Sequence, residues 1–466
     1  MLKFFKDFLI YGFASILAKI AAIFLMPLYT NVLTKEEYGV IALITSCKGV
    51  LDLFSNLNIH SGVARDYYEE GVDRKILVST GFYSTIAIST ILLVVMTLTL
   101  NIWTDRVLEI PNYKWPFFLM LLSIPTGSFQ LYFAILTRFK KKPLLYSIGS
   151  LLQLIIQIGI AVIGVVVLRK GISSIFLGVL VGEIVAFFFY LYINRSLLGT
   201  SFKKSYLGNI LRFSLPTLPA IMAGWIDSSV GQIIIGKYIS LEDLAVYSVA
   251  LQFVSIFSLI SGALQNVWSP FLYENYKNDA FKIQSQKIFI AFALVLMYIT
   301  IMLSLFSRDV VILLSNPNYV LASEYIPLLC APMSLLLLFP FVSSGITISR
   351  DTKHIAISYV IGSILNIVAM IILIPEYNIY AVPIALTASR LFTYCYMHVV
   401  SSKFLNVFFP HRYILSIILL SVVGYFVTLL DMNLIYKTAM AALISLMFFI
   451  YFVKNNSLLN LIRTKK

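Results

Sequence analysis

The chain has 466 residues, of which 60% are hydrophobic and only 12% are charged. A soluble globular domain carries roughly 25% charged residues, so this composition indicates that most of the chain meets lipid, and it excludes an ordinary water-soluble enzyme. A formal net charge of +14 would suggest nucleic-acid binding in a soluble protein. Here the positions of Lys and Arg along the chain are more informative than their sum, and no nucleic-acid partner is expected.

Apolar segments of about twenty residues recur along the whole chain, the length that crosses a hydrocarbon core roughly 30 Å thick. They predict helices, because stretches such as 289–306 are apolar on every side, whereas the strands of a barrel would alternate. The first segment is too long for a signal peptide and is kept as a span. In chain order the predicted spans lie near 7–33, 38–62, 76–103, 117–137, 144–168, 172–194, 213–237, 244–270, 288–306, 326–349, 355–374, 383–400, 413–430 and 434–453.

The basic residues fix the expected orientation of these fourteen spans. With the N-terminus in the cytoplasm, 24 of the 35 Lys and Arg residues fall on the cytoplasmic side, eight on the opposite side and three inside helices. The positive-inside rule therefore predicts a multi-pass protein of the inner membrane with both termini in the cytoplasm. The outward loops are short, the longest being 307–325, which disfavours an external catalytic domain. Three dispersed cysteines, Cys47, Cys330 and Cys395, are interpreted as small buried hydrophobic residues.

Two pairs of segments match each other at nearly equal offsets. TKEEYGVIAL at 34–43 aligns with SLEDLAVYSV at 240–249, and IGSLLQLI at 148–155 aligns with IGSILNIV at 361–368. Internal repeats of this kind are a common construction in transporters. The matches predict a six-helix half over 1–212, a second half over 213–402 and an appended helix pair with a basic tail over 403–466, with a central cleft between the halves.

Four longer stretches carry proline and glycine residues at the ends of spans 1, 5, 7 and 11. They are FLMPLYTNVLTKEEYGVIAL at 24–43, LRKGISSIFLGVLVGEI at 168–184, IGKYISLEDLAVYSVALQF at 235–253 and NIVAMIILIPEYNIYAVPIALTASR at 366–390. On these residues the chain resembles the polysaccharide transporters of the multidrug/oligosaccharidyl-lipid/polysaccharide (MOP) exporter superfamily, especially Wzx-type O-antigen flippases. It departs from them at Tyr380-Ala381-Val382, where many relatives have a Gly-Ala-Ala turn.

The resemblance implies an all-α, MATE/MurJ-like fold and a protein that is not an enzyme. Its expected function is to move an undecaprenyl-diphosphate-linked oligosaccharide, the repeat unit of O-antigen or another surface polysaccharide, from the cytoplasmic to the outer leaflet by alternating access. No cofactor and no metal are expected. The expected partners are the lipid-linked substrate, membrane lipid, H⁺ or Na⁺ as a coupling ion, and a polysaccharide polymerase with its chain-length regulator.

Six charged residues lie in the middle of predicted spans, where each costs about 2.5 to 3.5 kcal/mol on insertion scales. These candidate cavity residues are Lys19, Lys48, Asp52, Glu183, Asp227 and Arg390. Lys48 and Asp52 belong to a polar stripe along span 2, and they either line a translocation cavity or neutralise each other against neighbouring protein. The three basic and three acidic residues sum to zero, which gives the cleft no cationic bias.

The remaining four residues have similarly open interpretations. Glu183 and Arg390 occupy comparable positions in the two halves and form either an ion pair across the repeat axis or part of the cavity. Lys19 is expected to contact a substrate phosphate. Asp227 follows Pro216 and Pro219, which can loosen the helix, so Asp227 and Asp52 are candidate coupling-ion ligands.

Two alternative functions remain open at this level. A cation-coupled multidrug exporter of the same superfamily would show the same repeat and the same buried charges. A membrane polymerase or ligase is less favoured, because it would need a sizeable outward loop with Arg or His, and all four His residues lie near the cytoplasmic side.

Overall fold

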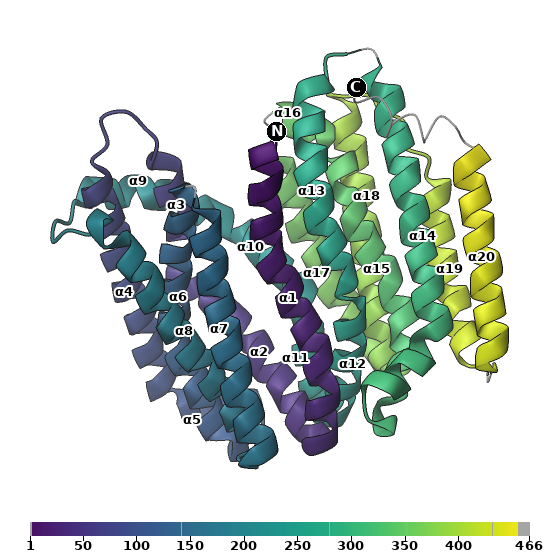
Figure 1. Ribbon diagram of the computed structural model, residues 1–466, viewed down its shortest axis with the longest axis horizontal. Coiled ribbons are helices and arrows are strands. Elements are labelled where there is room, and N and C mark those ends of the chain that lie inside the picture. Colours follow the sequence, from purple (N-terminus) through teal and green to yellow (C-terminus); the bar gives the residue numbers. More distant parts are fainter. Residues whose placement is uncertain are drawn as a thin grey trace. The chain divides into compact units, whose positions relative to one another are not determined.

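The computed structural model describes residues 2–140, 142–278, 280–349, 351, 353–430 and 432–454, which are helical apart from turns and short connections. Two compact units are present, Met1–Ala245 (unit 1) and Val246–Lys466 (unit 2). Figure 1 traces the helices of each unit in chain order. The predicted all-α membrane fold is thereby confirmed.

Unit 1 contains eleven helices and the start of a twelfth. They are α1 (Leu2–Val32), α2 (Lys35–Asn56), α3 (Ile59–Asp66), α4 (Arg74–Leu98), α5 (Leu100–Ile102), α6 (Lys114–Phe139), α7 (Pro143–Val162), α8 (Ser173–Asn194), α9 (Lys204–Ser214), α10 (Leu218–Trp225), α11 (Gly231–Tyr238) and α12 (Leu241–Val254), which runs on into unit 2. The other helices of unit 2 are α13 (Ile256–Asn275), α14 (Phe281–Leu314), α15 (Ala322–Val342), α16 (Ser344–Ser349), α17 (Lys353–Tyr377), α18 (Ala381–Ser402), α19 (Arg412–Thr428) and α20 (Leu434–Lys454).

Eleven segments of the described chain are long and apolar enough to cross a membrane. One of them, 353–402, consists of two helices, α17 and α18, which are joined by a 3₁₀ turn and pack against each other. Two shorter apolar helices, Leu17–Val32 in α1 and α19, complete the set. Counted in this way, the described helices agree with the fourteen predicted spans, and the protein is a multi-pass membrane protein.

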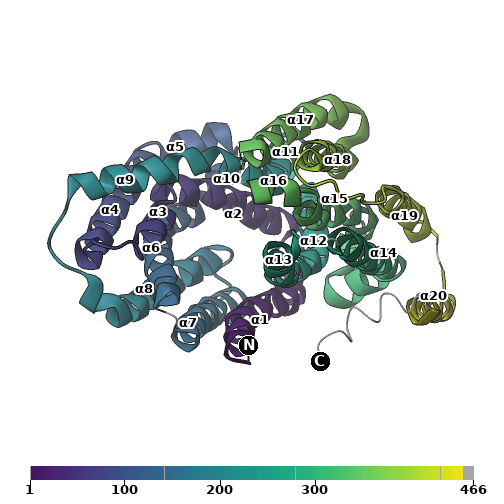
Figure 2. The same cartoon turned by 90° about the horizontal axis from the view of Figure 1, so that it is seen from above.

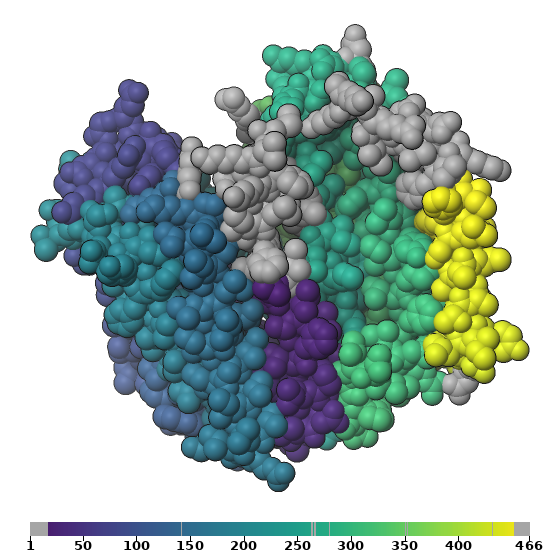
Figure 3. All heavy atoms as spheres, viewed as in Figure 1, coloured from purple at the N-terminus to yellow at the C-terminus, as the bar shows by residue number. Residues whose placement is uncertain are grey.

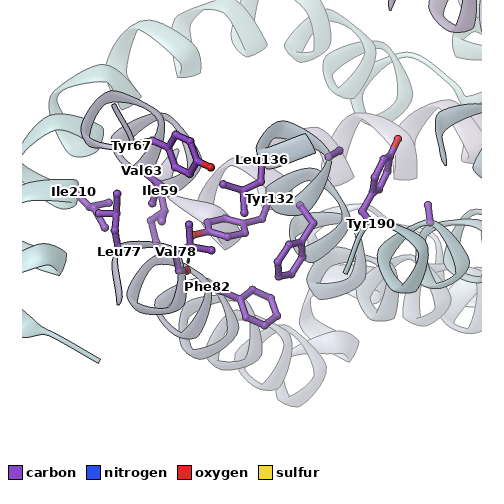
Figure 4. Packing of buried hydrophobic residues seen from close by; sticks show 13 residues of the cluster. Ile59, Val63, Tyr67, Leu77, Val78, Phe82, Tyr132, Leu136, Tyr190 and Ile210 are labelled. Carbon is purple, nitrogen blue, oxygen red and sulfur yellow. Dashed lines mark hydrogen bonds between the residues drawn. The ribbon is translucent and has the colours of Figure 1, made fainter. Parts of the chain in front are cut away.

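In unit 1 the long helices α6, α7 and α8 pack side by side, and α2 and α4 lie against α6. The amphipathic helix α9 lies across the ends of α3 and α4 (Figure 1, Figure 2). The core at this end is aromatic, and Figure 4 shows the Tyr132 ring beside Val78. The Tyr132 hydroxyl donates a hydrogen bond of 2.7 Å to the Val78 carbonyl, which satisfies a polar group that burial would otherwise penalise. This core fixes α3 against α6.

In unit 2 the helix α15 is tightly buried, because it packs against α14, α18 and α19. The last helix, α20 (yellow in Figure 3), packs along α14. Lys437 of α20 forms a 2.6 Å ion pair with Asp309 of α14. Most other side chains of α20 are exposed and apolar, as expected of a helix at the lipid boundary. Cys395 of α18 is also exposed, so the interpretation of all three cysteines as buried was wrong for this one, whereas Cys47 and Cys330 are buried.

The two pairs of matching segments have matching local structures. Thr34 and Glu37 form a capping box at the start of α2, and Ser240 caps α12 in the same way by accepting from the Asp243 N–H at 3.0 Å. In the second pair, Gly149 of α7 faces Tyr190 of α8, and Gly362 of α17 faces Thr393 of α18. Each glycine allows its helix to approach the next one closely. These shared features support the predicted repeat, whose half boundaries at 212 and 402 stay predictions.

One close approach joins the two capped segments themselves. Gly39 of α2 lies against Leu241 at the start of α12, and a Cβ at position 39 would be 2.7 Å from the Leu241 carbonyl carbon. We expect Gly39→Ala to lower the free energy of unfolding by about 1 to 3 kcal/mol, the usual cost of overpacking. The melting midpoint of the detergent-purified protein measures this effect.

A matched control is Gly159→Ala in α7, where an added Cβ would meet nothing within 4 Å. This variant should melt at the parent temperature or slightly above it, because Ala favours the helix. Equal midpoints for the two variants would contradict the importance of the contact between Gly39 and Leu241.

Candidate functional site

Three charged side chains of unit 1 meet between α2 and α8. The Lys48 ammonium lies 2.9 Å and 3.1 Å from the two carboxylate oxygens of Asp52, one helical turn further along α2. It also lies 3.3 Å from Oε1 of Glu183 on α8. The pairing of Lys48 with Asp52 was one of the two predicted alternatives. The contact with Glu183 was not predicted, because Glu183 was considered only together with Arg390.

A third helix, α6, also contributes residues to this cluster. Thr126 donates a hydrogen bond of 3.1 Å to Oε2 of Glu183, so both oxygens of that carboxylate have partners. Gly127 makes room for it, since a Cβ at this position would lie 3.0 Å from Glu183 Oε1. Nothing in the sequence marked Thr126 or Gly127 as functional, because a Thr-Gly pair inside an apolar helix has no distinctive pattern. We call Lys48, Asp52, Glu183 and Thr126 the charge cluster.

The cluster is buried at one side and accessible at the other. The Glu183 side chain is only 8% exposed and the Lys48 side chain 14%, whereas the Asp52 side chain is 38% exposed. Asp52 therefore faces space that protein atoms do not fill. Two carboxyl groups share one ammonium group, so the cluster either carries a net negative charge or holds a proton. Its composition is thus suited to exchange a cation or a proton through Asp52.

Two further polar residues near the end of α2, Ser55 and Asn56, have a structural role. Ser55 is buried and forms a 2.5 Å hydrogen bond with Ser128 of α6. Ser55 and Asn56 both donate to the Asp52 carbonyl, at 2.8 Å and 2.6 Å, in the last turn of the helix. These two residues therefore terminate α2 and attach it to α6.

Asp227 lies in a π-helical turn, Ile226–Val230, between α10 and α11. This turn packs against α2, and the Trp225 indole N–H donates a hydrogen bond of 3.1 Å to the Ser46 carbonyl there. Single π turns are frequent at functional sites. Pro216 and Pro219 were expected to loosen the helix, and the α-helix does change to a 3₁₀ turn, Leu215–Thr217, which contains Pro216 and lies two residues before Pro219. At Asp227 itself the irregularity is the π turn.

The two remaining predicted residues lie elsewhere in the fold. Lys19 is half-buried within α1, a helix that packs against α7. Arg390 of α18 belongs to unit 2 and is 3% exposed. Its guanidinium donates a hydrogen bond of 2.7 Å to the Pro332 carbonyl and lies 3.5 Å from the Met333 sulfur. The expected facing of Glu183 and Arg390, and the lining of a cavity by all six residues, stay predictions.

Unit 1 also contains two cavities lined by other residues. One, of about 550 Å³, lies where α3 meets the last turns of α6 and includes His60 and Arg138 in its lining. The other, of about 460 Å³, lies at the end of α1 and includes Asn31, Glu37 and Arg169. Arg138 was only one of the 24 basic residues counted on the cytoplasmic side, and no sequence pattern indicated that it lines a cavity.

Removing the cation of the charge cluster should destabilise the fold. Lys48→Met leaves two carboxylates together without a counter-ion, and we expect a loss of about 3 to 5 kcal/mol. Adding Glu183→Gln should restore part of that loss, because Gln keeps the oxygen that accepts from Thr126 and removes one charge. Melting midpoints in detergent measure both effects.

The matched control is Lys114→Met, which breaks the half-exposed ion pair of 2.8 Å between Lys114 and Asp105. An exposed pair of this kind contributes little to stability, so its loss should change the midpoint little. No recovery in the Lys48→Met/Glu183→Gln double variant would show that Glu183 does not share the Lys48 charge.

Comparisons with known proteins agree with this architecture. Residues 30–324 match the family described as polysaccharide biosynthesis protein. The Lsg locus putative protein 1 of Haemophilus influenzae is 22% identical over 385 residues, which cover 80% of this chain and 92% of that protein.

Two solved structures share the fold at low sequence identity. The lipid II flippase MurJ in an inward closed conformation has a TM-score of 0.74 and 17% identity, covering 95% of this chain and 99% of that chain. An inward-facing multidrug resistance MATE family transporter of the MOP superfamily has a TM-score of 0.67 and 14% identity, covering 85% of this chain and 95% of that chain. The predicted MATE/MurJ-like fold is confirmed by these matches. The chain belongs to the polysaccharide biosynthesis protein family and has the fold that MurJ and the MATE transporters share.

Proposed function

We propose that the protein is a flippase that moves an undecaprenyl-diphosphate-linked oligosaccharide from the cytoplasmic to the outer leaflet by alternating access. The observation that carries this proposal is Lys48, an ammonium group inside a membrane-spanning helix, which two carboxylates hold within 3.3 Å. A diphosphate headgroup that crosses the hydrocarbon layer needs a cation there. Family membership and the fold of a lipid II flippase support the same class of cargo.

The charge cluster suggests how cargo and ion are coupled. While Asp52 and Glu183 are both ionised, they compete with any phosphate for the Lys48 ammonium. Proton uptake by one carboxyl group weakens that competition and makes Lys48 available to the diphosphate. Asp52 is the carboxyl group that a proton can reach from outside the cluster, because its side chain is 38% exposed and that of Glu183 only 8%. The cluster would then take up a proton when cargo binds and release it when cargo leaves.

The second candidate is a cation-coupled multidrug exporter, and the fold shared with a MATE transporter favours it. The six charged residues predicted within the spans sum to zero, which suits a cationic drug as well as an anionic lipid. The helix pair α19 and α20 favours the polysaccharide branch, since the drug exporters usually have twelve spans. The MATE comparison covers 85% of this chain and the MurJ comparison 95%, in line with additional helices.

Single substitutions test whether the predicted charged residues are needed for transport. Lys19, Asp52, Asp227 and Arg390 are each replaced with Ala, and surface polysaccharide is measured at equal protein levels in the membrane. Loss of one charge-assisted contact is expected to lower export about 10-fold or more. The control is Asp105→Ala, because Asp105 is paired with a lysine at 2.8 Å and is 37% exposed, much like Asp52, but lies outside the membrane-spanning helices. Full export in all four variants would refute the site.

Deletion of the gene separates the two candidate functions. A flippase predicts that lipid-linked oligosaccharide accumulates in the inner leaflet, where an added membrane-impermeant glycosidase cannot reach it in intact spheroplasts. An exporter predicts normal surface glycans and greater sensitivity to cationic dyes. Normal glycans together with unchanged lipid-linked oligosaccharide would rule out the flippase.

A further inference from the structure

The cavity of about 550 Å³ at the junction of α3 and α6 lies apart from the charge cluster. Its polar lining consists of His60, Ser61, Tyr68 and Arg138, and Ile135 and Phe139 contribute apolar walls. Sites for small molecules usually measure 300 to 1,000 Å³ and combine apolar walls with a few polar groups, so this volume suits a ligand headgroup. By the distribution of Lys and Arg, it lies at the basic, cytoplasmic end of unit 1.

The walls of the cavity are held in place by aromatic contacts. The Tyr68 hydroxyl donates a hydrogen bond of 2.7 Å to the Phe139 carbonyl and so attaches the end of α3 to the last turn of α6. The Arg138 guanidinium lies over the Tyr146 ring of α7, 5.5 Å from its centroid. Stacking of this kind fixes the plane of a guanidinium and lowers the entropy that it loses on binding an anion. The site is therefore largely formed before any ligand arrives.

The lining is cationic, in contrast to the charge cluster. Among the described residues, the ionisable groups of the lining are Arg138, His60 and the Tyr68 phenol, and no carboxylate belongs to it. Asp66, Glu69 and Glu70 belong to the same connection but not to the lining. The hydroxyl protons of Ser61 and Tyr68 are directed to Asn58 and Phe139, whereas the Arg138 guanidinium has several N–H groups and can donate to a ligand in addition to its protein partners, as can an N–H of the His60 ring.

We propose that this cavity binds the phosphate-bearing headgroup of a lipid, with Arg138 as the anchor and His60 as a second donor. A guanidinium can bind two phosphate oxygens at once, and Tyr68, Ile135 and Phe139 offer apolar surface to the first carbons of the lipid chain. The inference deepens the proposed function and rests on it for direction, because the cytoplasmic leaflet is where the cargo is loaded. The cavity is then a loading site that cargo occupies before it reaches Lys48.

Binding to the full-length protein in detergent tests the site. The probes are geranylgeranyl diphosphate, dioleoyl phosphatidylglycerol and inorganic diphosphate, and dissociation constants are measured by native mass spectrometry or thermophoresis. Arg138→Ala is expected to raise the dissociation constant for both lipids at least about 10-fold. Arg138→Lys should give an intermediate value, because Lys retains the charge but not the two-point geometry.

The matched control is Arg195→Ala. Arg195 follows α8 at the same end of unit 1, and its guanidinium lies over the Tyr192 ring, 4.5 Å from the centroid, but it does not line the cavity. This variant should bind both lipids as the parent does. A second variant, Ala64→Trp, keeps Arg138 and fills the cavity, and it should also weaken lipid binding about 10-fold.

The outcomes are distinct for the site and for the proposed function. Unchanged lipid binding in both Arg138→Ala and Ala64→Trp would overturn the site, and so would an effect confined to inorganic diphosphate. A preference of the parent for the diphosphate lipid over phosphatidylglycerol identifies cargo as the ligand, and the opposite preference identifies bulk phospholipid. Arg138-dependent lipid binding in a protein whose deletion leaves glycans normal would keep the site and refute the flippase.

Discussion

The constraint on which the rest of unit 1 depends is the cost of keeping charged groups inside a membrane. Lys48, Asp52 and Glu183 are tolerable there only because both carboxylates lie within 3.3 Å of the Lys48 ammonium, and these distances require α2, α6 and α8 to pack at one level. Gly127 supplies the space and Thr126 the last hydrogen bond. The arrangement is neutral only when it holds a proton, since two carboxyl groups face one ammonium group. Packing, stability and sensitivity to protons thus share one physical origin.

The second constraint is that backbone N–H and C=O groups inside lipid need hydrogen-bond partners, because an unpaired group costs free energy there, as a charge does. The matched segments meet it with the same device, a side chain that caps the start of α2 and of α12. Ser55 and Asn56 close the other end of α2 by bonding to the Asp52 carbonyl. The backbone carbonyl of Asp52 therefore accepts the hydrogen bonds that end its helix, which ties the geometry of the cluster to the integrity of α2.

The local features of this fold could be predicted from the sequence, whereas contacts between distant segments could not. Apolar length is a property of each segment alone, so the spans and their repeat were accessible, as was the pairing of Lys48 with Asp52 one turn away. Glu183 lies 135 positions from Lys48, and no periodicity links them. The π turn at Asp227 and the exposure of Cys395 depend likewise on neighbouring helices. Arg138 was visible only as one of the basic residues counted on the cytoplasmic side, because a cavity is defined by the surfaces of several helices.

The two cations proposed to meet phosphate differ in a way that gives the pathway an order. The described lining of the cavity at Arg138 includes no carboxylate, so no acidic group of that lining competes with an anion there. Lys48 is already occupied by two carboxylates, so an anion binds there only as one of them gains a proton or moves away. Thr126 and Arg138 are twelve residues apart on α6, or roughly 18 Å along the helix axis. A headgroup that travels this distance passes from a site open to any phosphate to one that demands a proton. Selection of cargo for transport would then occur at the second site, not at entry.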